Sequence, residues 1–189
     1  MSRKLAPPPF NWPDSDETHQ GIEPIFTAND IQARIDELAT VLARWFEDEP
    51  VAQVVMNGAF LFAADICRAL SARGVVMEMD FLTVEKNRRT GERSLAFATN
   101  RPVADRDVLI IDDIFETGNT LAMATEHFTN LGASSVTSVV LLDKSNGKDV
   151  GIRPDYVGFD CPSVFVIGYG MDIGYRYREL PFIGKMGQA

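Results

Sequence analysis

The segment from Val108 to Thr120 constrains the fold of this chain more than any other. Four apolar residues, Val108 to Ile111, are followed at once by two carboxylates, and a helical apolar pattern begins at Leu121. The apolar run predicts a buried strand, and the pattern after it predicts a helix. The polar residues between them are therefore expected on a loop that connects a buried strand to a helix.

The chemistry of this loop suits a sugar phosphate. Backbone N–H groups at the start of a helix bind phosphate, and the hydroxyls of Thr117 and Thr120 add donors. Asp112 and Asp113 would repel a phosphate, so we expect them to accept hydrogen bonds from a neutral diol such as ribose. Each part alone has an ordinary reading, as a solvated turn or as helix capping. The combination in this order predicts a phosphoribosyl site.

Strand and helix patterns alternate along most of the chain. A capping-box start at Thr27 and Asp30 predicts a first helix, with Pro50 after it. Further strands are predicted at 51–56, 75–84, 136–142, 156–159 and 164–167, further helices at 59–72 and 121–131, and a turn-rich tail after them. This order predicts an α/β fold with a mostly parallel, twisted sheet flanked by helices. Ligands bind at the carboxyl ends of such strands, where the loops 57–59, 112–120 and 143–148 are expected to meet.

Length and composition predict one domain, residues 25–189, preceded by an arm. Residues 1–24 carry five prolines among polar and acidic residues, which predicts an arm without regular structure. The charged run 85–93 has two readings, a solvated hairpin tip or a mobile lid.

Charge and cysteine usage exclude several classes of protein. The formal net charge of −9 argues against a nucleic-acid-binding surface and against binding to anionic membranes. The apolar stretches are too short to span a bilayer. Cys67 and Cys161 form no C-x-x-C pair, so we expect a cytoplasmic protein in which both behave as small hydrophobes. His19 and His127 lack the spacing of zinc ligands.

The run from Val108 to Thr120 resembles the phosphoribosyl-pyrophosphate (PRPP) signature of the type I phosphoribosyltransferases. The segments 55–65, 141–144, 154–159 and 165–181 are similar in order and spacing to the hypoxanthine-guanine branch of that family. The resemblance covers about residues 25–185. It implies the family's fold, with a small C-terminal hood formed mainly by residues 154–185.

The resemblance also implies a role for each matching position. PRPP would be bound by Asp112, Asp113, Glu116, Thr117, Gly118, Asn119 and Thr120, its pyrophosphate by Met56, Asn57, Gly58 and Arg178, and the purine by Lys144, Phe165, Val166 and Asp172. Asp172 would help to hold Mg²⁺, the implied cofactor. Glu116 would be the catalytic group, near purine N7. The Met56–Asn57 peptide bond would be cis.

The residue types agree with these roles. Lys144 can donate to the O6 of a 6-oxopurine, which disfavours adenine because its 6-amino group also donates. The ring of Phe165 offers a face on which a base can stack, and Arg178 can bind two phosphate oxygens at once. Read without the resemblance, these are an ordinary strand-end lysine, a core aromatic and a surface arginine.

Several positions depart from the family pattern. Glu116 stands for the usual aspartate, Asp112 for a glutamate, and Asn57 for a lysine that would face pyrophosphate. Thr83 and Val84 stand at about the place of a serine-tyrosine pair on the mobile loop.

The resemblance implies a purine salvage enzyme that transfers the 5-phosphoribosyl group from PRPP to N9 of a 6-oxopurine. Hypoxanthine is the first candidate, guanine the second and xanthine the third, with IMP or GMP and pyrophosphate as products. Two alternatives stay open: a PRPP- or nucleotide-binding regulator with little catalysis, and a phosphoribosyltransferase for a different base. A homodimer or homotetramer is expected from the resemblance.

Overall fold

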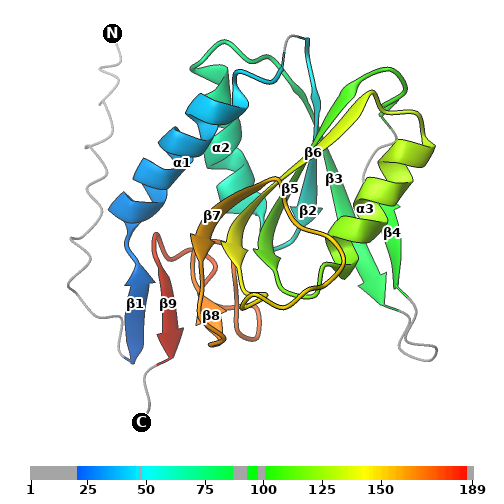
Figure 1. The fold of residues 1–189 in the computed structure, drawn as a ribbon. Helices are drawn as coiled ribbons and strands as arrows, with labels where there is room; N and C mark the ends of the chain where they lie inside the picture. The colour runs from blue at the N-terminus through cyan, green and yellow to red at the C-terminus, as the bar shows by residue number, and fades with distance from the viewer. Residues whose placement is uncertain (1–20, 47, 87–92, 98–100, 187–189) are drawn as a thin grey trace, which may run out of the picture.

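The computed structural model describes residues 21–46, 48–86, 93–97 and 101–186 (Figure 1). The larger of its two sheets has the strand order β4-β3-β2-β5-β6-β7, in which every neighbouring pair is parallel except β3 and β4. The strands are β2 (Val51–Met56), β3 (Glu78–Lys86), β4 (Arg93–Phe97), β5 (Asp107–Phe115), β6 (Ser135–Asp143) and β7 (Tyr156–Asp160). The predicted α/β architecture with a mostly parallel sheet is confirmed.

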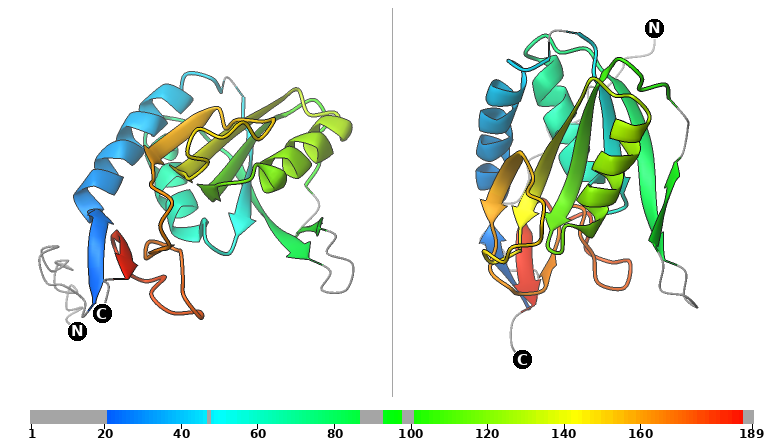
Figure 2. Two further views of the ribbon diagram at one scale, coloured as in Figure 1. Left: turned by 60° about the horizontal axis from the view of Figure 1, so that its bottom comes forward. Right: turned by 45° about the vertical axis from the view of Figure 1, so that its right-hand side comes forward.

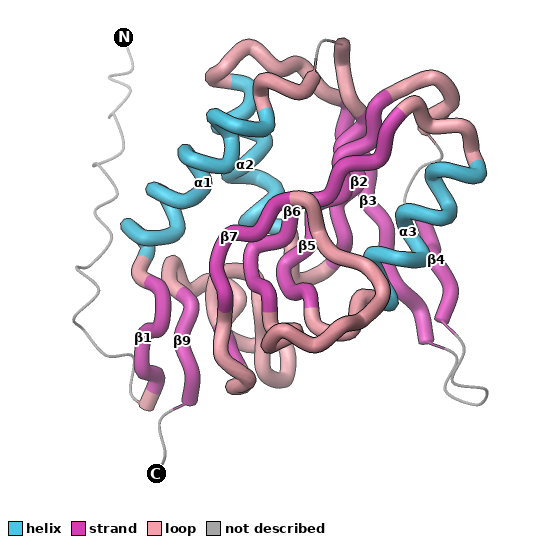
Figure 3. Tube along the Cα trace, viewed as in Figure 1, coloured by secondary structure: helices cyan, strands magenta, loops and turns pink. Residues whose placement is uncertain are grey.

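Helices cover both faces of this sheet (Figures 1, 2 and 3). Helices α1 (Ala28–Leu42) and α2 (Phe60–Ser71) pack on one face, and α3 (Asn119–Asn130) packs on the other. In β5, Leu109 and Ile111 join the core under α1 and α2, whereas Val108 and Ile110 join the core under α3. Because successive side chains point to opposite faces and both faces are covered here, the run from Val108 to Ile111 is apolar at every position. None of the described helices is long and apolar enough to cross a membrane.

The hood is built on a second, antiparallel sheet. Its strand order is β1-β9-β8, with β1 (Ile22–Phe26), β8 (Val166–Ile167) and β9 (Ile183–Met186). Figure 2 shows this small sheet near the carboxyl ends of the larger one. Residues from both ends of the chain therefore form the hood, which covers one end of the main sheet.

The structure differs from the predicted boundaries of the arm and hood. Residues 22–24, predicted as part of an irregular arm, lie in β1, and the predicted turn-rich tail contains β9. β7, predicted as part of the hood, is the edge strand of the main sheet. β1 and β9 are short and pair only with segments distant in the sequence, so neither carries a local strand signal. The rest of the predicted arm, residues 1–20, lies outside the described residues.

The boundaries of β5, α3 and β3 near the predicted site also differ from those predicted. β5 continues to Phe115, so Asp112 and Asp113 lie on the strand and not on the loop, and α3 begins at Asn119 rather than at Leu121. β3 starts three residues later than predicted and ends at Lys86, because it pairs with β4 as a hairpin. Thr83 and Val84 lie within β3. β3 and β4 form a hairpin around the charged run 85–93, but residues 87–92, which would form the predicted tip or lid, lie outside the described residues.

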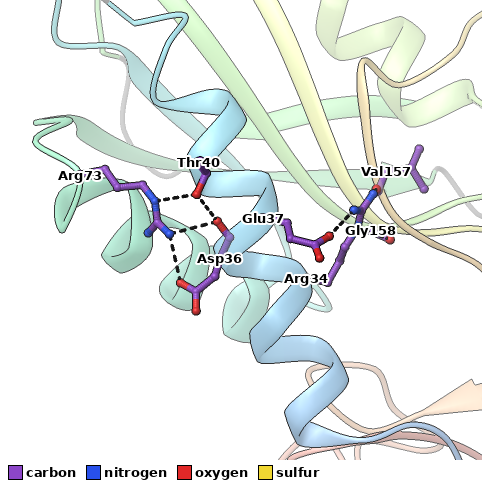
Figure 4. A network of polar contacts seen from close by, with 7 residues as sticks. All are labelled: Arg34, Asp36, Glu37, Thr40, Arg73, Val157 and Gly158. Carbon is purple, nitrogen blue, oxygen red and sulfur yellow. Dashed lines mark hydrogen bonds and ion pairs between the residues drawn. The ribbon is translucent and has the colours of Figure 1, made fainter.

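A guanidinium connects α1 to the edge of the main sheet (Figure 4). Arg34 donates from Nε to the carbonyl oxygen of Gly158 at 2.7 Å and from Nη2 to that of Val157 at 2.9 Å. Its Nη1 forms an ion pair with Glu37 on the solvent side, at 2.7 Å. Unpaired edge carbonyls attract other strands, so Arg34 covers polar groups of β7 that would otherwise face water.

Replacing Arg34 with alanine is expected to lower the free energy of unfolding by about 2 kcal/mol, because two hydrogen bonds from a charged donor are lost. Urea denaturation monitored by circular dichroism measures this change. The matched control is Glu37→Ala, which removes only the exposed ion pair and should cost less than about 0.5 kcal/mol. Equal costs for the two variants would show that the contacts with β7 contribute nothing.

Candidate active site

A cleft of about 600 Å³ opens where the carboxyl ends of β2, β5 and β6 face the hood. Its lining residues are Met56, Asn57, Gly58, Asp113, Ile114, Glu116, Lys144, Ser163, Val164, Phe165, Val166, Met171, Asp172 and Arg178. Each of the three loops expected at this edge contributes to the lining. The structure thus brings together the predicted pyrophosphate and purine residues, with Asp113 and Glu116 from the acidic run.

The loop after β2 lies directly against the acidic strand. The Met56–Asn57 peptide bond is cis, as the resemblance implied. Gly58 approaches Asp113 so closely that a Cβ at this position would lie 1.7 Å from the Asp113 carboxylate oxygen Oδ2. A side chain here would force the Asp113 carboxylate or the loop to move, because the Gly58 backbone and the Asp113 carboxylate share one part of the cleft.

The two neighbouring carboxylates have different surroundings, because β5 continues through both. Asp113 lines the cleft, whereas Asp112 is only 8% exposed and is absent from the lining residues. Oδ1 of Asp112 accepts a hydrogen bond from the backbone N–H of Asp113 at 2.9 Å. Burial, and then the negative charge of Asp113, raise the pKa of Asp112 well above that of an ordinary aspartate. Asp112 therefore holds a proton more readily than an ordinary aspartate.

The predicted phosphate loop forms the turn into α3. Gly118 adopts φ +72°, in the left-handed region that favours glycine, and no side chain caps the helix. Asn119 donates from Nδ2 to Thr117 Oγ1 at 3.0 Å, and Thr120 lies in the first turn of the helix. The first N–H groups of a helix have no partner within it, so this turn can present donors to an anion. These four residues adjoin Glu116, although they do not line the cleft described above.

The predicted purine-binding residues come from β6 and from the hood. Lys144 directly follows β6, and its backbone N–H donates to the carbonyl oxygen of Phe115 at 2.7 Å, which ties the ends of β5 and β6 together. The Phe165 side chain is 60% exposed although it is large and apolar, and Val166 behind it is buried. An exposed aromatic ring on the wall of a cleft provides a surface on which a flat ligand can stack.

The hood contributes an ion pair to the cleft. Arg178 Nη2 lies 2.7 Å from Asp172 Oδ1, and Arg178 Nη1 donates to the carbonyl oxygen of Gly170 at 2.5 Å. The second oxygen of Asp172 accepts from the backbone N–H of Tyr175 at 2.7 Å. The two side chains are therefore positioned by each other and by the backbone of the hood.

Neither cysteine takes part in this site. Cys67 and Cys161 are free and buried, as predicted, and burial raises the pKa of the Cys67 thiol to about 12. Within the described ranges, no group of three or more histidine, cysteine, aspartate or glutamate side chains could hold a metal ion.

Four further residues of the lining were given no role by the sequence: Ile114, inside the acidic run, and three residues of the hood. Val164 was placed in a strand without a role in the site, and Met171 adjoins the predicted Asp172. Ser163 follows Pro162 in a loop and carries no local signal that could have marked it. Their place in the cleft follows from the path of the hood.

Comparisons with known proteins agree with this geometry. The chain matches the model of the phosphoribosyl transferase domain over residues 27–173. It is 36% identical over 170 residues to the hypoxanthine-guanine phosphoribosyltransferase of Bacillus subtilis, covering 87% of this chain and 93% of that protein. For the hypoxanthine phosphoribosyltransferase of Escherichia coli the identity is 33% over 172 residues, covering 87% and 95%.

Solved structures show the same similarity in three dimensions. The hypoxanthine phosphoribosyltransferase of Trypanosoma cruzi in complex with its product IMP superposes with a TM-score of 0.82 at 33% sequence identity. The superposition covers 89% of this chain and 92% of that one. The sequence similarity and the structural similarity therefore cover nearly the same share of the chain.

Proposed function

Because this chain belongs to the type I phosphoribosyltransferases, with hypoxanthine-guanine phosphoribosyltransferases among its relatives, we propose that its cleft transfers the 5-phosphoribosyl group from PRPP to a 6-oxopurine. The observation that carries this proposal is the meeting of two acidic residues of β5 and its loop, Lys144 and the Asp172–Arg178 pair in one cleft. Hypoxanthine and guanine are the substrates, with xanthine as a further candidate.

The reaction is a nucleophilic substitution at the ribose carbon C1′. The bond between N9 of the purine and C1′ forms, the bond between C1′ and the pyrophosphate oxygen breaks, and the purine loses a ring proton. Positive charge develops on the ribose ring in the transition state, as in glycoside hydrolysis. Glu116 lines the cleft beside Asp113 and can accept the proton from purine N7.

The remaining residues bind and orient the two substrates. Asp113 accepts hydrogen bonds from the ribose hydroxyls, and the buried Asp112 beside it stays a second predicted acceptor. The N–H groups at the start of α3 bind the 5′-phosphate, together with Thr117 and Thr120. Asn57, Gly58 and Arg178 face the pyrophosphate. Lys144 donates to the purine O6, Phe165 stacks on the base and the Val166 backbone bonds to its edge.

The donor set of the cleft fits Mg²⁺ bound together with PRPP. Mg²⁺ typically takes one or two carboxylates and completes its shell with waters and substrate phosphates. Asp172 supplies a carboxylate at the cleft beside Arg178, and the described residues form no larger acidic cluster that would hold the ion alone. When bound, the ion would neutralise charge on the leaving pyrophosphate.

Glu116→Gln is expected to lower kcat by about 100-fold while changing the KM for PRPP by less than about threefold, because a general base acts mainly in the transition state. Steady-state kinetics with PRPP as the varied substrate measure both constants. Glu126→Gln, on the exposed face of α3, is the matched control and should behave as the unchanged protein. Equal losses of kcat and of PRPP affinity in Glu116→Gln would contradict the proposal that Glu116 faces the purine.

A product assay tests the proposed function directly. Purified protein is incubated with PRPP and magnesium and with hypoxanthine, guanine, xanthine or adenine in parallel. IMP and GMP without AMP is the expected result. Saturable binding of PRPP without product from any base would instead favour the regulatory reading.

The assembly is proposed to be a homodimer or homotetramer. One similar structure of the Trypanosoma cruzi enzyme addresses the role of its C-terminal region in oligomeric state and activity. Light scattering after size-exclusion chromatography gives the mass of the particle and decides between monomer, dimer and tetramer.

A further inference from the structure

One hydrogen bond joins the hood to the helix that follows the pyrophosphate loop. The hydroxyl of Tyr169 donates to Oδ2 of Asp65 on α2 at 2.5 Å, across 104 positions of sequence. The other oxygen of Asp65 forms an ion pair with Arg68, one turn further along the helix. Tyr169 is only 6% exposed. The bond to Asp65 therefore stabilises this arrangement, because burying a hydroxyl without a hydrogen-bond partner costs free energy.

A second contact lies at the next residue. The backbone of Gly170 approaches the pyrophosphate loop so closely that a Cβ there would lie 2.0 Å from the carbonyl oxygen of Gly58. Gly170 adopts φ +98°, and Tyr169 adopts φ +47°, a region that is uncommon for tyrosine. Two adjacent residues of the hood thus attach to α2 and to the loop that precedes it.

The same short segment carries the charged groups of the cleft. The Gly170 carbonyl oxygen accepts a hydrogen bond from the Arg178 guanidinium. The Gly170 backbone N–H in turn donates to the Arg178 carbonyl oxygen at 2.9 Å. The Tyr169 N–H donates to the Leu180 carbonyl oxygen, also at 2.9 Å. Asp172 follows two residues after Gly170 and pairs with Arg178. A displacement of residues 169–170 would therefore displace both charged side chains relative to Gly58.

We propose that Tyr169 and Asp65 are positioning residues that hold the Asp172–Arg178 pair at a fixed place opposite the pyrophosphate loop. Neither of them lines the cleft, and they act through the backbone of the hood. The proposal rests on the proposed function for its effect on catalysis. Small misplacements of binding groups have large effects on rate, so the bond is expected to tune the binding of PRPP and pyrophosphate, which Arg178 faces, more than that of the base, which Lys144 and Phe165 contact.

Tyr169→Phe tests the proposal because it keeps the buried ring and removes only the hydroxyl. The KM for PRPP in the forward reaction and for pyrophosphate in the reverse reaction should rise about tenfold, as expected for a lost bond to a charged acceptor. The KM for hypoxanthine should stay within about twofold. Asp65→Asn keeps an acceptor oxygen, so its KM values for PRPP and pyrophosphate should lie close to those of the unchanged protein. Those of Asp65→Ala should resemble the values of Tyr169→Phe.

Tyr156→Phe is the matched control. Tyr156 lies on the edge strand β7, where its hydroxyl interacts with Trp45, and it does not line the cleft, so the constants for PRPP and pyrophosphate should not change. If Tyr169→Phe leaves these two constants unchanged, or raises the KM of all substrates together, the proposal is overturned.

Hydrogen exchange in the free protein tests the contact without any turnover. Tyr169→Phe should speed the exchange of the Tyr169 and Gly170 amides and of the loop around Gly58, while the strands of the main sheet keep their protection. Unchanged exchange in these segments would overturn the proposal even if activity changed. If the protein forms no nucleotide in the product assay, the proposed function is refuted. Hydrogen exchange would still decide whether the bond between Tyr169 and Asp65 holds the hood in place.

Discussion

Replacing Lys144 with alanine is expected to lower kcat/KM for hypoxanthine and guanine by about 10- to 100-fold, because a charge-assisted hydrogen bond is lost. Lys144 lies at the end of β6 and lines the cleft opposite the hood. Its ammonium group can only donate, so in the proposed function it pairs with the O6 of a 6-oxopurine and opposes the 6-amino group of adenine. The residual activity with adenine should therefore stay the same or rise, and the discrimination between the bases should shrink.

Competition assays with pairs of bases measure this discrimination directly. Lys148→Ala is the matched control, since Lys148 lies on the same loop, is exposed and is absent from the cleft. The substitution at position 144 leaves the backbone hydrogen bond from residue 144 to Phe115 in place, so the loop should keep its path. An unchanged preference for hypoxanthine over adenine in Lys144→Ala would remove this lysine from purine recognition.

The central strands and the site at their ends could be predicted because their signals are local. β2 begins and ends where the apolar run predicted, and β5 was found because it is buried on both faces. Parallel order then places the carboxyl ends of β2, β5 and β6 at one edge. The loops that carry Asn57, Glu116 and Lys144 had to meet there for this reason.

The hood could not be predicted in the same way because its contacts are not local. β1 and β9 come from opposite ends of the chain, and each has only a few residues, including Pro24 in β1 and Gly184 in β9. The bond between Asp65 and Tyr169 likewise joins distant segments. The burial of Asp112 was missed because β5 runs further than expected, and alternation along a strand turns neighbouring side chains to opposite faces.

The cationic side chains of the cleft leave much of the anion binding to backbone N–H groups. Asn57 stands where the family has a lysine, and Arg178 is already paired with Asp172 in the free protein. Lys144 is assigned to the base. N–H groups after β2 and at the start of α3 are therefore expected to provide many of the contacts with phosphate oxygens. Binding of PRPP should then depend strongly on the path of the loop at Gly58.

Gly58→Ala is expected to weaken PRPP binding by about 100-fold, since misplacement by about an ångström can cost that much. The new Cβ would lie 1.7 Å from Oδ2 of Asp113, so either the loop or the carboxylate must move. In the proposed function both belong to the PRPP site. Gly58, unlike Gly118, does not adopt a positive φ, so alanine is strained there only by this contact. Isothermal titration of PRPP with magnesium measures the dissociation constant.

A double-mutant cycle with Asp113→Ala separates the contact from other effects of the substitution. Removing the carboxylate removes the atoms that the new methyl group meets, although it also weakens binding of the ribose by itself. Gly58→Ala should then cost less than about threefold when it is added to Asp113→Ala, because residues in direct contact are not additive. If the two losses multiply instead, the methyl group acts elsewhere in the loop. The close packing of Gly58 on Asp113 would then not be what sets the affinity for PRPP.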